Sequence, residues 1–373
     1  MKQTQWLYGT VLAGLFLFAG AATAQVTSAL WGVNGEAWNP TNSVLRDFTD
    51  VGYMSGDVAI PTNWPVGTDV TDYGAVPDDA ISDFDAFMAA ISNCPPGHAI
   101  FVPKGTYWIT DCLKVSDQSN FVLRGEDMYE TVLYFPTNMS VLYPEAEYDY
   151  RYSVIAPPAV WWMQNGTNMN IEHVTIEFSE ERMGDHFNHD GRPGIKYDSV
   201  RDSWIRNVCI KNANDGIILN VSRRITAMNI VLDQYKERPS EGENTVGHHG
   251  LVVRGARNCL YHNCFVTGRW QHDLITADKD IHNVYSRIKV IDGQLDHHAM
   301  HARENLWTDL DMGEGLRIWE QGNNISYPDE TSWNVYRSTA TGTTNRMITP
   351  DPSRQNVVVG LENEDPTSIG SNW

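Results

Sequence analysis

The sequence predicts an all-β fold in which the chain winds into a parallel β-helix, a solenoid of stacked coils. Strand-like segments recur at near-constant spacing, and an Asn or Ser follows most of them at one offset. Periods of about 20 to 25 residues with short strands are typical of such solenoids, whose coils bury a shared core. An amphipathic segment before the repeats predicts an N-terminal capping helix.

Four segments define the repeat, GIKYDSV, GIILNVS, GLVVRGA and DLITADK, and they start at Gly194, Gly216, Gly250 and Asp273. Thirteen residues after these starts come Asn207, Asn229, Asn263 and Ser286. Asn tolerates left-handed backbone geometry, and aligned amides hydrogen-bond between stacked strands. We therefore expect an amide ladder at one corner. The polar stretch QYKERPSEGENTVG predicts a loop inserted between the second and third coils.

The same register extends in both directions, with further starts at Val160, His298 and Gly315. Before the repeats, Ile81, Phe84, Met88 and Ile91 follow roughly helical spacing. This pattern predicts an amphipathic helix that covers the open end of the solenoid, where strand edges would otherwise be exposed.

The segment DYGAVPDDAISDFDAFMAAI, followed by GHAIFVPKGTYWI, resembles the opening of pectate-lyase-like proteins. The preceding LRDFTDVGYMSGDVAIP resembles the N-terminal extension of secreted polysaccharide-degrading members. The resemblance spans about residues 40–330. It implies a right-handed parallel β-helix and a polysaccharide-degrading enzyme, in a superfamily that hosts lyases, hydrolases and epimerases.

Residues 1–24 have the pattern of a secretory signal, with Lys2, an apolar run and the small residues Ala22–Ala24. They predict a secreted or periplasmic protein, and no later stretch is apolar enough to span a membrane. We expect an N-terminal extension over 25–67, a catalytic β-helix domain over 68–330, and a strand and loop cap over 331–373.

The formal net charge of −20 argues against nucleic acid and anionic membrane surfaces as partners. An acidic polysaccharide substrate would need locally basic surface. Five cysteines are present. In an oxidising compartment Cys94 and Cys112 can form a disulfide, whereas Cys209, Cys259 and Cys264 are expected as buried thiols.

Candidate site residues come from reading equivalent positions on successive coils. The position just before each start gives Asp215, His249, His272 and His297. Stacked strands lie about 4.8 Å apart, so we expect these side chains to form a vertical column. Outward positions two and four residues after the starts add Trp162, Lys196, Arg254, Arg317 and Trp319. A histidine column can also be purely structural.

The leading hypothesis is β-elimination on an acidic, uronate-containing or sulfated polysaccharide. His272 or His249 would be the base that removes the proton alpha to a carboxylate, since imidazole is available in its neutral form near pH 7. Cations would neutralise the carboxylate or bind sulfate: Lys196, Arg254, Arg303 and Arg317. Trp162 and Trp319 would stack on sugar rings.

Two alternatives remain open. A β-helix glycoside hydrolase needs two carboxylates. NANDGI around Asp215, GHHG at Gly247–Gly250 and RIK at Arg287–Lys289 partly resemble polygalacturonase motifs, and Asp215 with Asp273 or Asp278 is the remaining carboxylate pair. The other alternative is a non-catalytic carbohydrate-binding solenoid.

No metal ligands or other cofactor are predicted. The HHAMH stretch, His297–His301, places its side chains on alternating faces, so they should not converge on one metal ion. The sequence also lacks the compact acidic set of pectate-lyase calcium sites, which argues against Ca²⁺.

Overall fold

The chain is represented by a computed structural model. It describes residues 36, 39, 41, 47–143, 161–179, 191–234, 244–298, 302–313, 319–321, 335–340 and 357–363. Among these residues, no helix has the length and apolar character needed to cross a membrane. The signal sequence predicted over 1–24 lies outside the described residues.

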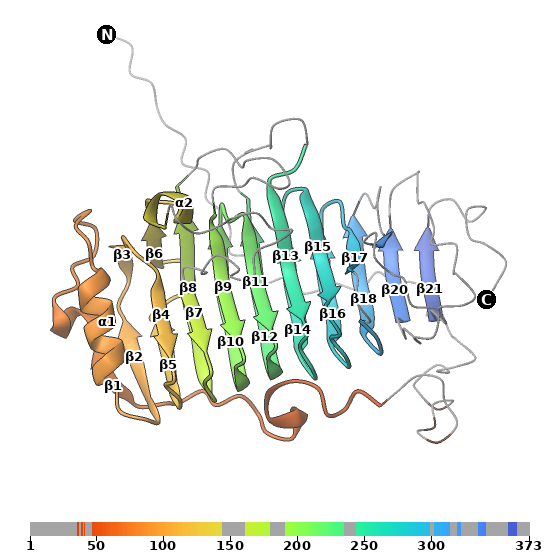
Figure 1. Cartoon of the computed structure of the whole chain (residues 1–373), viewed down its shortest axis with the longest axis horizontal. Helices are drawn as coiled ribbons and strands as arrows, with labels where there is room; N and C mark the ends of the chain where they lie inside the picture. Colours follow the sequence, from red (N-terminus) through yellow and green to blue (C-terminus); the bar gives the residue numbers. More distant parts are fainter. Residues whose placement is uncertain are drawn as a thin grey trace, which may run out of the picture.

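Parallel strands stacked along the long axis of the molecule form two sheets (Figure 1). The larger has 13 strands: β1 (Val66–Asp69), β2 (His98–Val102), β3 (Gly105–Trp108), β5 (Phe121–Gly125), β6 (Thr131–Phe135), β8 (Met169–Phe178), β10 (Arg201–Lys211), β12 (Arg223–Asp233), β14 (Leu260–Val266), β16 (Val284–Val290), β18 (Leu306–Gly313), β20 (Val335–Ala340) and β21 (Val357–Asn363).

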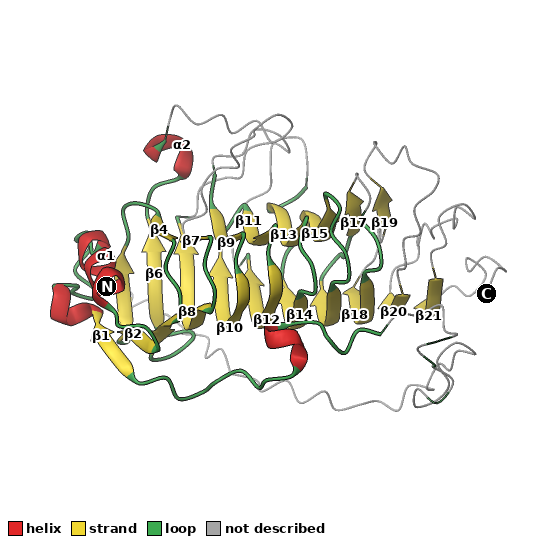
Figure 2. Ribbon diagram, turned by 60° about the horizontal axis from the view of Figure 1, so that its bottom comes forward, coloured by secondary structure: helices red, strands yellow, loops and turns green. Residues whose placement is uncertain are grey.

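The smaller sheet has eight strands: β4 (Leu113–Ser116), β7 (Trp161–Gln164), β9 (Pro193–Asp198), β11 (Asp215–Asn220), β13 (Gly247–Arg254), β15 (Trp270–Ala277), β17 (Leu295–His298) and β19 (Trp319–Gln321). From β7 to β20, successive strands alternate between the two sheets, and the two sheets face one another (Figure 2). The predicted all-β parallel β-helix is confirmed. β11 pairs directly with β13, so the polar stretch between them is an insertion between neighbouring coils, as predicted.

The core lies between the two sheets and consists of inward columns that run from coil to coil. One such column joins Ile195, Ile217, Leu251, Leu274 and Leu295 through direct strand pairing. The side chains of this column are 0–1% exposed. Each coil alone cannot bury such residues, so stacking is what makes the core continuous.

The predicted amide ladder is present for the three asparagines. The Asn263 amide donates to Asn229 Oδ1 at 2.7 Å, and the Asn229 amide donates to Asn207 Oδ1 at 2.8 Å. All three have φ between 52° and 54°. The prediction for Ser286 is wrong by one residue: Ser286 pairs with His262, and Arg287 has the positive φ. The turn after β15 holds two left-handed residues, Asp278 and Lys279, and this extra residue shifts the corner.

His173 ends the ladder and makes it sensitive to pH. The Asn207 amide lies 3.2 Å from His173 Nε2. Because the amides all donate in one direction, Nε2 accepts and the imidazole is neutral. Burial lowers the pKa of His173. A lowered folded-state pKa means that the unfolded chain binds more protons, so this group's stabilisation is complete above about pH 6.5 and is lost as the pH falls.

We expect His173→Asn to remove this part of the acid sensitivity, because Asn accepts the same hydrogen bond through an oxygen that does not titrate. The measurement is the thermal unfolding midpoint of both proteins between about pH 7.5 and 5. The difference between wild type and variant should change across this range. A constant difference would contradict the role of His173.

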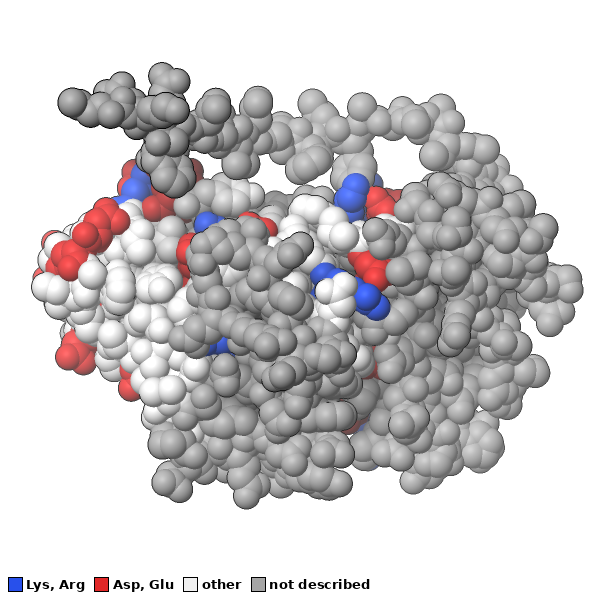
Figure 3. Space-filling view, turned by 90° about the horizontal axis from the view of Figure 1, so that it is seen from above, with Lys and Arg blue, Asp and Glu red and all other residues white. Residues whose placement is uncertain are grey.

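The capping helix is α1 (Phe84–Asn93), at the end of the solenoid where β1 and β2 lie (Figure 1). Phe87 and Ile91 are buried, while Phe84 and Met88 pack partly against the core. Ile81 is 67% exposed, contrary to the predicted face, because the helix begins three residues later and Phe87 fills the core instead. Acidic side chains gather at this end (Figure 3): Asp72, Asp78, Asp79 and Asp85 are exposed.

Short helical segments flank the solenoid: η1 (Tyr53–Gly56), η2 (Val70–Tyr73) and α2 (Met139–Leu142). Residues 47–65 run along the outside of the 13-stranded sheet, crossing the coils in reverse order (Figure 1). Phe48 stacks on His282 with ring centroids 4.6 Å apart, and the Tyr53 N–H donates to Thr226 Oγ1 at 2.8 Å. We call this segment the N-terminal strap.

A buried ion-pair network lies beneath the strap. Glu172 on β8 receives Arg124 from β5 and Arg206 from β10, with nitrogen–oxygen distances of 2.5 Å on each side. The same arginines donate to the strap carbonyls of Trp64 and Pro61 at 2.8 and 2.9 Å. The carboxylate therefore ties three coils and the strap together.

The cysteines differ from the predicted disulfide. Cys94 and Cys112 are thiols. The Cys94 Sγ is directed at the Pro95 and His98 carbonyls, each 3.7 Å away. Cys112 is buried just before β4 of the eight-stranded sheet. Cys209, Cys259 and Cys264 are buried thiols, as predicted, and burial raises the pKa of each to about 12.

Candidate functional site

The structure confirms the central part of the predicted column. Asp215 pairs with His249, and His249 pairs with His272, so the three come from consecutive strands β11, β13 and β15. His249 Nδ1 lies 2.7 Å from Asp215 Oδ1. The His249 and His272 rings are stacked, with centroids 5.6 Å apart. All three side chains are 4–5% exposed.

An irregularity at the start of each strand directs these side chains outward. A Cβ on Gly216 would lie 2.7 Å from Leu232 Cδ1 in the core, so this inward position requires glycine. On the next coil, Asn214 O accepts the N–H groups of both His248 and His249, at 2.7 and 3.3 Å. Two residues facing one carbonyl break the alternation of a regular strand and re-aim side chains, as a β-bulge does.

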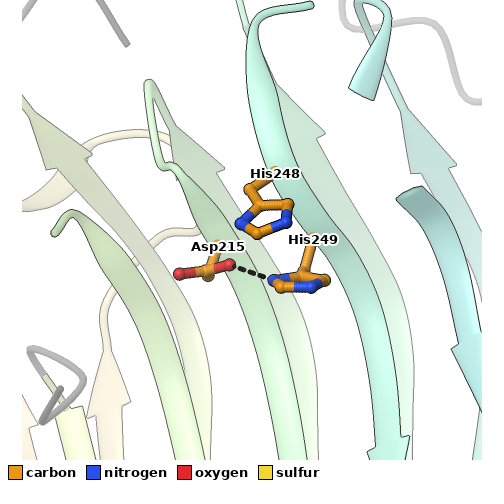
Figure 4. A group of neighbouring side chains, drawn as sticks. All are labelled: Asp215, His248 and His249. Atoms are coloured by element: carbon orange, nitrogen blue, oxygen red, sulfur yellow. Dashed lines mark hydrogen bonds and ion pairs between the residues drawn. The ribbon is translucent and has the colours of Figure 1, made fainter. Parts of the chain in front are cut away.

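The result is that two successive histidines lie side by side instead of on opposite faces. The His248 and His249 rings are stacked with centroids 3.7 Å apart, and the His248 and His272 centroids are 5.6 Å apart. Figure 4 shows His248 beside His249, with Asp215 reaching toward both from the neighbouring strand. His248 is fully buried.

The prediction that His297 continues this column is wrong. Leu274 pairs with Leu295, so this coil advances 21 residues (295 − 274) rather than the 25 (298 − 273) that the predicted start assumed. His297 pairs with Thr276, four residues beyond His272. Its backbone therefore belongs to the column of Leu219, Val253 and Thr276.

The side chain of Asp296 lies next to His272, although its backbone belongs to the neighbouring outward column. Its Oδ2 lies 3.3 Å from His272 Nδ1. Asp296 is 1% exposed and pairs with Ile275, on the outward side of the same sheet. Each of the two histidines therefore has an aspartate at its Nδ1, an arrangement that leaves Nε2 as the other ring nitrogen available for chemistry.

The next outward column also follows the prediction: Trp162, Lys196, Ile218, Val252 and Ile275 pair in succession. Val252, Ile275 and Ala277 form a buried apolar cluster on the outer side of the sheet. Lys196 is 4% exposed and its Nζ lies 4.0 Å from Asp198 Oδ2. Burial lowers the pKa of Lys196, and nearby Arg254 adds to this effect.

The predicted cations do not lie beside the histidines. Lys196 is on β9, three coils before His272, hence about 14 Å away along the stack. Arg254 pairs with Ala277, five residues after His272, hence about 16 Å away along the strand. It contacts Asp278, with a nitrogen–oxygen distance of 3.2 Å.

The remaining substrate-binding candidates are separated from this column. Arg303 pairs with Ile281 at the corner before β18, in a column with Arg223 and Arg257, and so does not lie on the eight-stranded sheet. Trp319 pairs with Leu295, so its backbone follows the register of Leu295 and not that of the outward column. Arg317 lies outside the described residues.

The carboxylates considered for hydrolysis lie in different surroundings. Asp273 is fully buried, and its Oδ2 accepts the Gln294 N–H at 3.0 Å. Asp278 follows His272 by six residues, about 20 Å along the strand from the column of Asp215. Inverting hydrolases need carboxylates about 6.5–9.5 Å apart. The RIK segment lies on β16 of the other sheet.

Comparison with known proteins agrees with this architecture. Residues 67–295 match the family model described as rhamnogalacturonase A/epimerase, pectate lyase-like, and the chain belongs to this family. The polygalacturonase from Erwinia carotovora ssp. carotovora is similar with a TM-score of 0.54, at 10% identity, over 84% of this chain and 98% of that chain. These findings confirm the pectate-lyase-like right-handed β-helix.

A second similar structure is the mannuronan C-5 epimerase AlgE6 A-module from Azotobacter vinelandii. Its TM-score is 0.50, at 12% identity, over 79% of this chain and 94% of that chain. No curated protein matches the chain. At these identities the solved structures show the shared fold.

Sequence analysis missed three residues of this region: His248, Asp296 and Arg192. Arg192 is fully buried two coils before His248, and its carbonyl accepts the N–H of Asn214 on the intervening coil at 2.8 Å. The HH doublet in GHHG was a signal for His248. No comparable signal pointed to Asp296, since its placement depends on the length of one coil.

Proposed function

We propose that the chain is a polysaccharide lyase that cleaves an acidic, uronate-containing polysaccharide by β-elimination, with His272 as the base. The observation that carries this proposal is the contact between His272 Nδ1 and Asp296 Oδ2, 3.3 Å apart. A carboxylate at Nδ1 favours the tautomer with hydrogen on Nδ1, stabilises the imidazolium formed later, and leaves Nε2 to take a proton.

In the proposed reaction, Nε2 removes the proton on the carbon alpha to the uronate carboxylate. The electron pair forms a carbon–carbon double bond to the next ring carbon, and the bond from that carbon to the bridging oxygen breaks. The bridging oxygen leaves with a proton on the new chain end. His249, stacked on His272 and paired with Asp215, is the nearest described group that can give this proton.

Lysis is favoured over hydrolysis by the spacing of the outward carboxylates. Asp215 and Asp296 lie on β11 and β17, three coils and therefore about 14 Å apart along the stack. Asp215 contacts His249 and Asp296 contacts His272, so the two carboxylates do not flank a common space that a glycosidic bond would occupy. The secretory signal predicted over residues 1–24 is consistent with an activity outside the cytoplasm.

The test is to incubate the full chain with a panel of acidic polysaccharides, following ultraviolet absorbance and reducing ends together. Elimination produces both signals in equal amounts, because each cut creates one conjugated unsaturated uronate. Reducing ends without absorbance, lost in Asp215→Asn, would establish hydrolysis instead. Neither signal, with binding retained, would indicate the non-catalytic solenoid.

Asp296→Asn is expected to lower kcat with little change in KM. Asp296 stabilises the imidazolium of His272 as an ion-pair partner, which contributes about 1–4 kcal/mol at such distances, so the loss should be roughly ten- to several hundredfold. The steady-state rate of ultraviolet absorbance increase measures it. An unchanged kcat in a variant with wild-type thermal stability would exclude Asp296 as the positioning residue of His272.

A further inference from the structure

One cluster near the proposed base has the composition of a metal site. Asp215, His248 and His249 each offer a ligand atom, and all these atoms lie within 4.8 Å of one another. The three side chains are 0–5% exposed and come from the adjacent strands β11 and β13. Figure 4 shows them converging on one small region.

The backbone holds this cluster together. Arg192 O accepts the N–H groups of Asn214 and Asp215 at 2.8 and 3.4 Å, and Asn214 O accepts those of His248 and His249. The same irregularity therefore recurs on two successive coils, so that the carboxylate of one coil faces two imidazoles of the next. An ordinary strand would send the second imidazole to the opposite face.

The donor set selects the kind of ion. Ca²⁺ and Mg²⁺ prefer oxygen ligands, whereas imidazole nitrogens suit Zn²⁺ and other first-row transition metals. Zinc–ligand distances are about 2.0–2.2 Å, so two ligand atoms of a tetrahedral site lie about 3.3–3.6 Å apart. The ligand atoms here lie within 4.8 Å of one another, so binding requires side-chain movements of up to about 1 Å.

We propose that Asp215, His248 and His249 bind one divalent transition-metal ion, with Zn²⁺ as the best fit. Three protein ligands with an open position are typical of zinc sites that also contact a substrate or water. The His272 ring centroid lies 5.6 Å from those of both histidine ligands, which places the ion next to the proposed base without making His272 a ligand.

Metal binding is independent of the reaction, but its role rests on the proposed function. Elimination requires positive charge at the substrate carboxylate. Lys196 lies about 14 Å from His272 along the stack of coils, and Arg254 lies about 16 Å from it along the strand direction. A divalent ion in the cluster would supply that charge beside His272. In the metal-bound state Asp215 and His249 would hold the ion, and the proton that His272 removes from the substrate would pass from its imidazolium to the leaving oxygen.

The experiment uses the full chain after chelator treatment, without substrate. Titration with Co²⁺, followed by its visible absorption, and with Zn²⁺ by calorimetry should give one ion per chain. His248→Gln should weaken binding at least tenfold, and Asp215→Asn should do the same. His262→Gln, a half-buried histidine on β14 of the other sheet, is the matched control and should bind as wild type does.

The proposal is overturned if the wild type binds no stoichiometric ion, or if His262→Gln loses as much affinity as His248→Gln. Should the site variants not fold, X-ray absorption of the zinc-loaded wild type decides: imidazole scattering supports the site, and sulfur or oxygen-only coordination excludes it. His272→Ala separates the two proposals, because it should lose elimination and still bind Co²⁺.

Discussion

His272→Ala is expected to reduce the formation of unsaturated uronate ends by about 10² to 10⁴-fold, the usual contribution of a general base. The variant removes the only atom of this side chain that can accept the substrate proton. His272 lies beside His249 and Asp296 in the eight-stranded sheet, so the loss should appear in kcat at saturating polysaccharide. The ultraviolet progress curve measures it directly.

His262→Gln is the control for this result, since His262 belongs to the 13-stranded sheet. Its kcat should match that of the wild type. Thermal unfolding of His272→Ala must remain close to wild type for the comparison to hold. A folded His272→Ala variant with full elimination activity would remove His272 as the base.

Glu172→Gln is expected to lower the free energy of unfolding by about 3–5 kcal/mol, as breaking a buried ion pair typically does. The carboxylate is 1% exposed and receives both Arg124 and Arg206. An amide cannot neutralise two guanidinium groups that are held on neighbouring coils. Denaturant unfolding followed by tryptophan fluorescence reports the change, because Trp204 and Trp64 lie beneath and within the strap.

Glu130→Gln provides the matched comparison. Glu130 pairs with Lys104 at 3.1 Å, but their side chains are 63% and 42% exposed. An exposed pair contributes about 0–1 kcal/mol, so this variant should be nearly as stable as the wild type. Equal losses in the two variants would show that the buried network does not join the coils and the strap as inferred.

Local pattern predicted most of the solenoid because the chemistry of a coil is repeated along the chain. Inward aliphatic residues, corner asparagines and inward glycines recur at one spacing, and the observed pairing of β9, β11, β13 and β15 follows it. The register predicted from the sequence fails where a coil changes length. One extra residue in the turn after β15 moved the corner from Ser286 to Arg287.

The candidate site shows more clearly that coil length cannot be predicted from the repeat alone. A coil four residues shorter than assumed moved His297 out of the column of His272, and the side chain of Asp296, which pairs with Ile275, lies beside His272 instead. A regular strand would place His248 on the face opposite His249. The shared Asn214 carbonyl cancels that alternation, and such a local irregularity leaves no periodic trace in a sequence.

The sequence alone determined the winding of the chain, its helical cap, its acidic charge and the vertical alignment of Asp215, His249 and His272. Tertiary structure alone decided which groups meet there: Asp296 at His272, His248 at His249, and the arginines around Glu172. The physical reason is that a repeating core sets the average coil, whereas contacts between side chains depend on the length and bend of each individual coil.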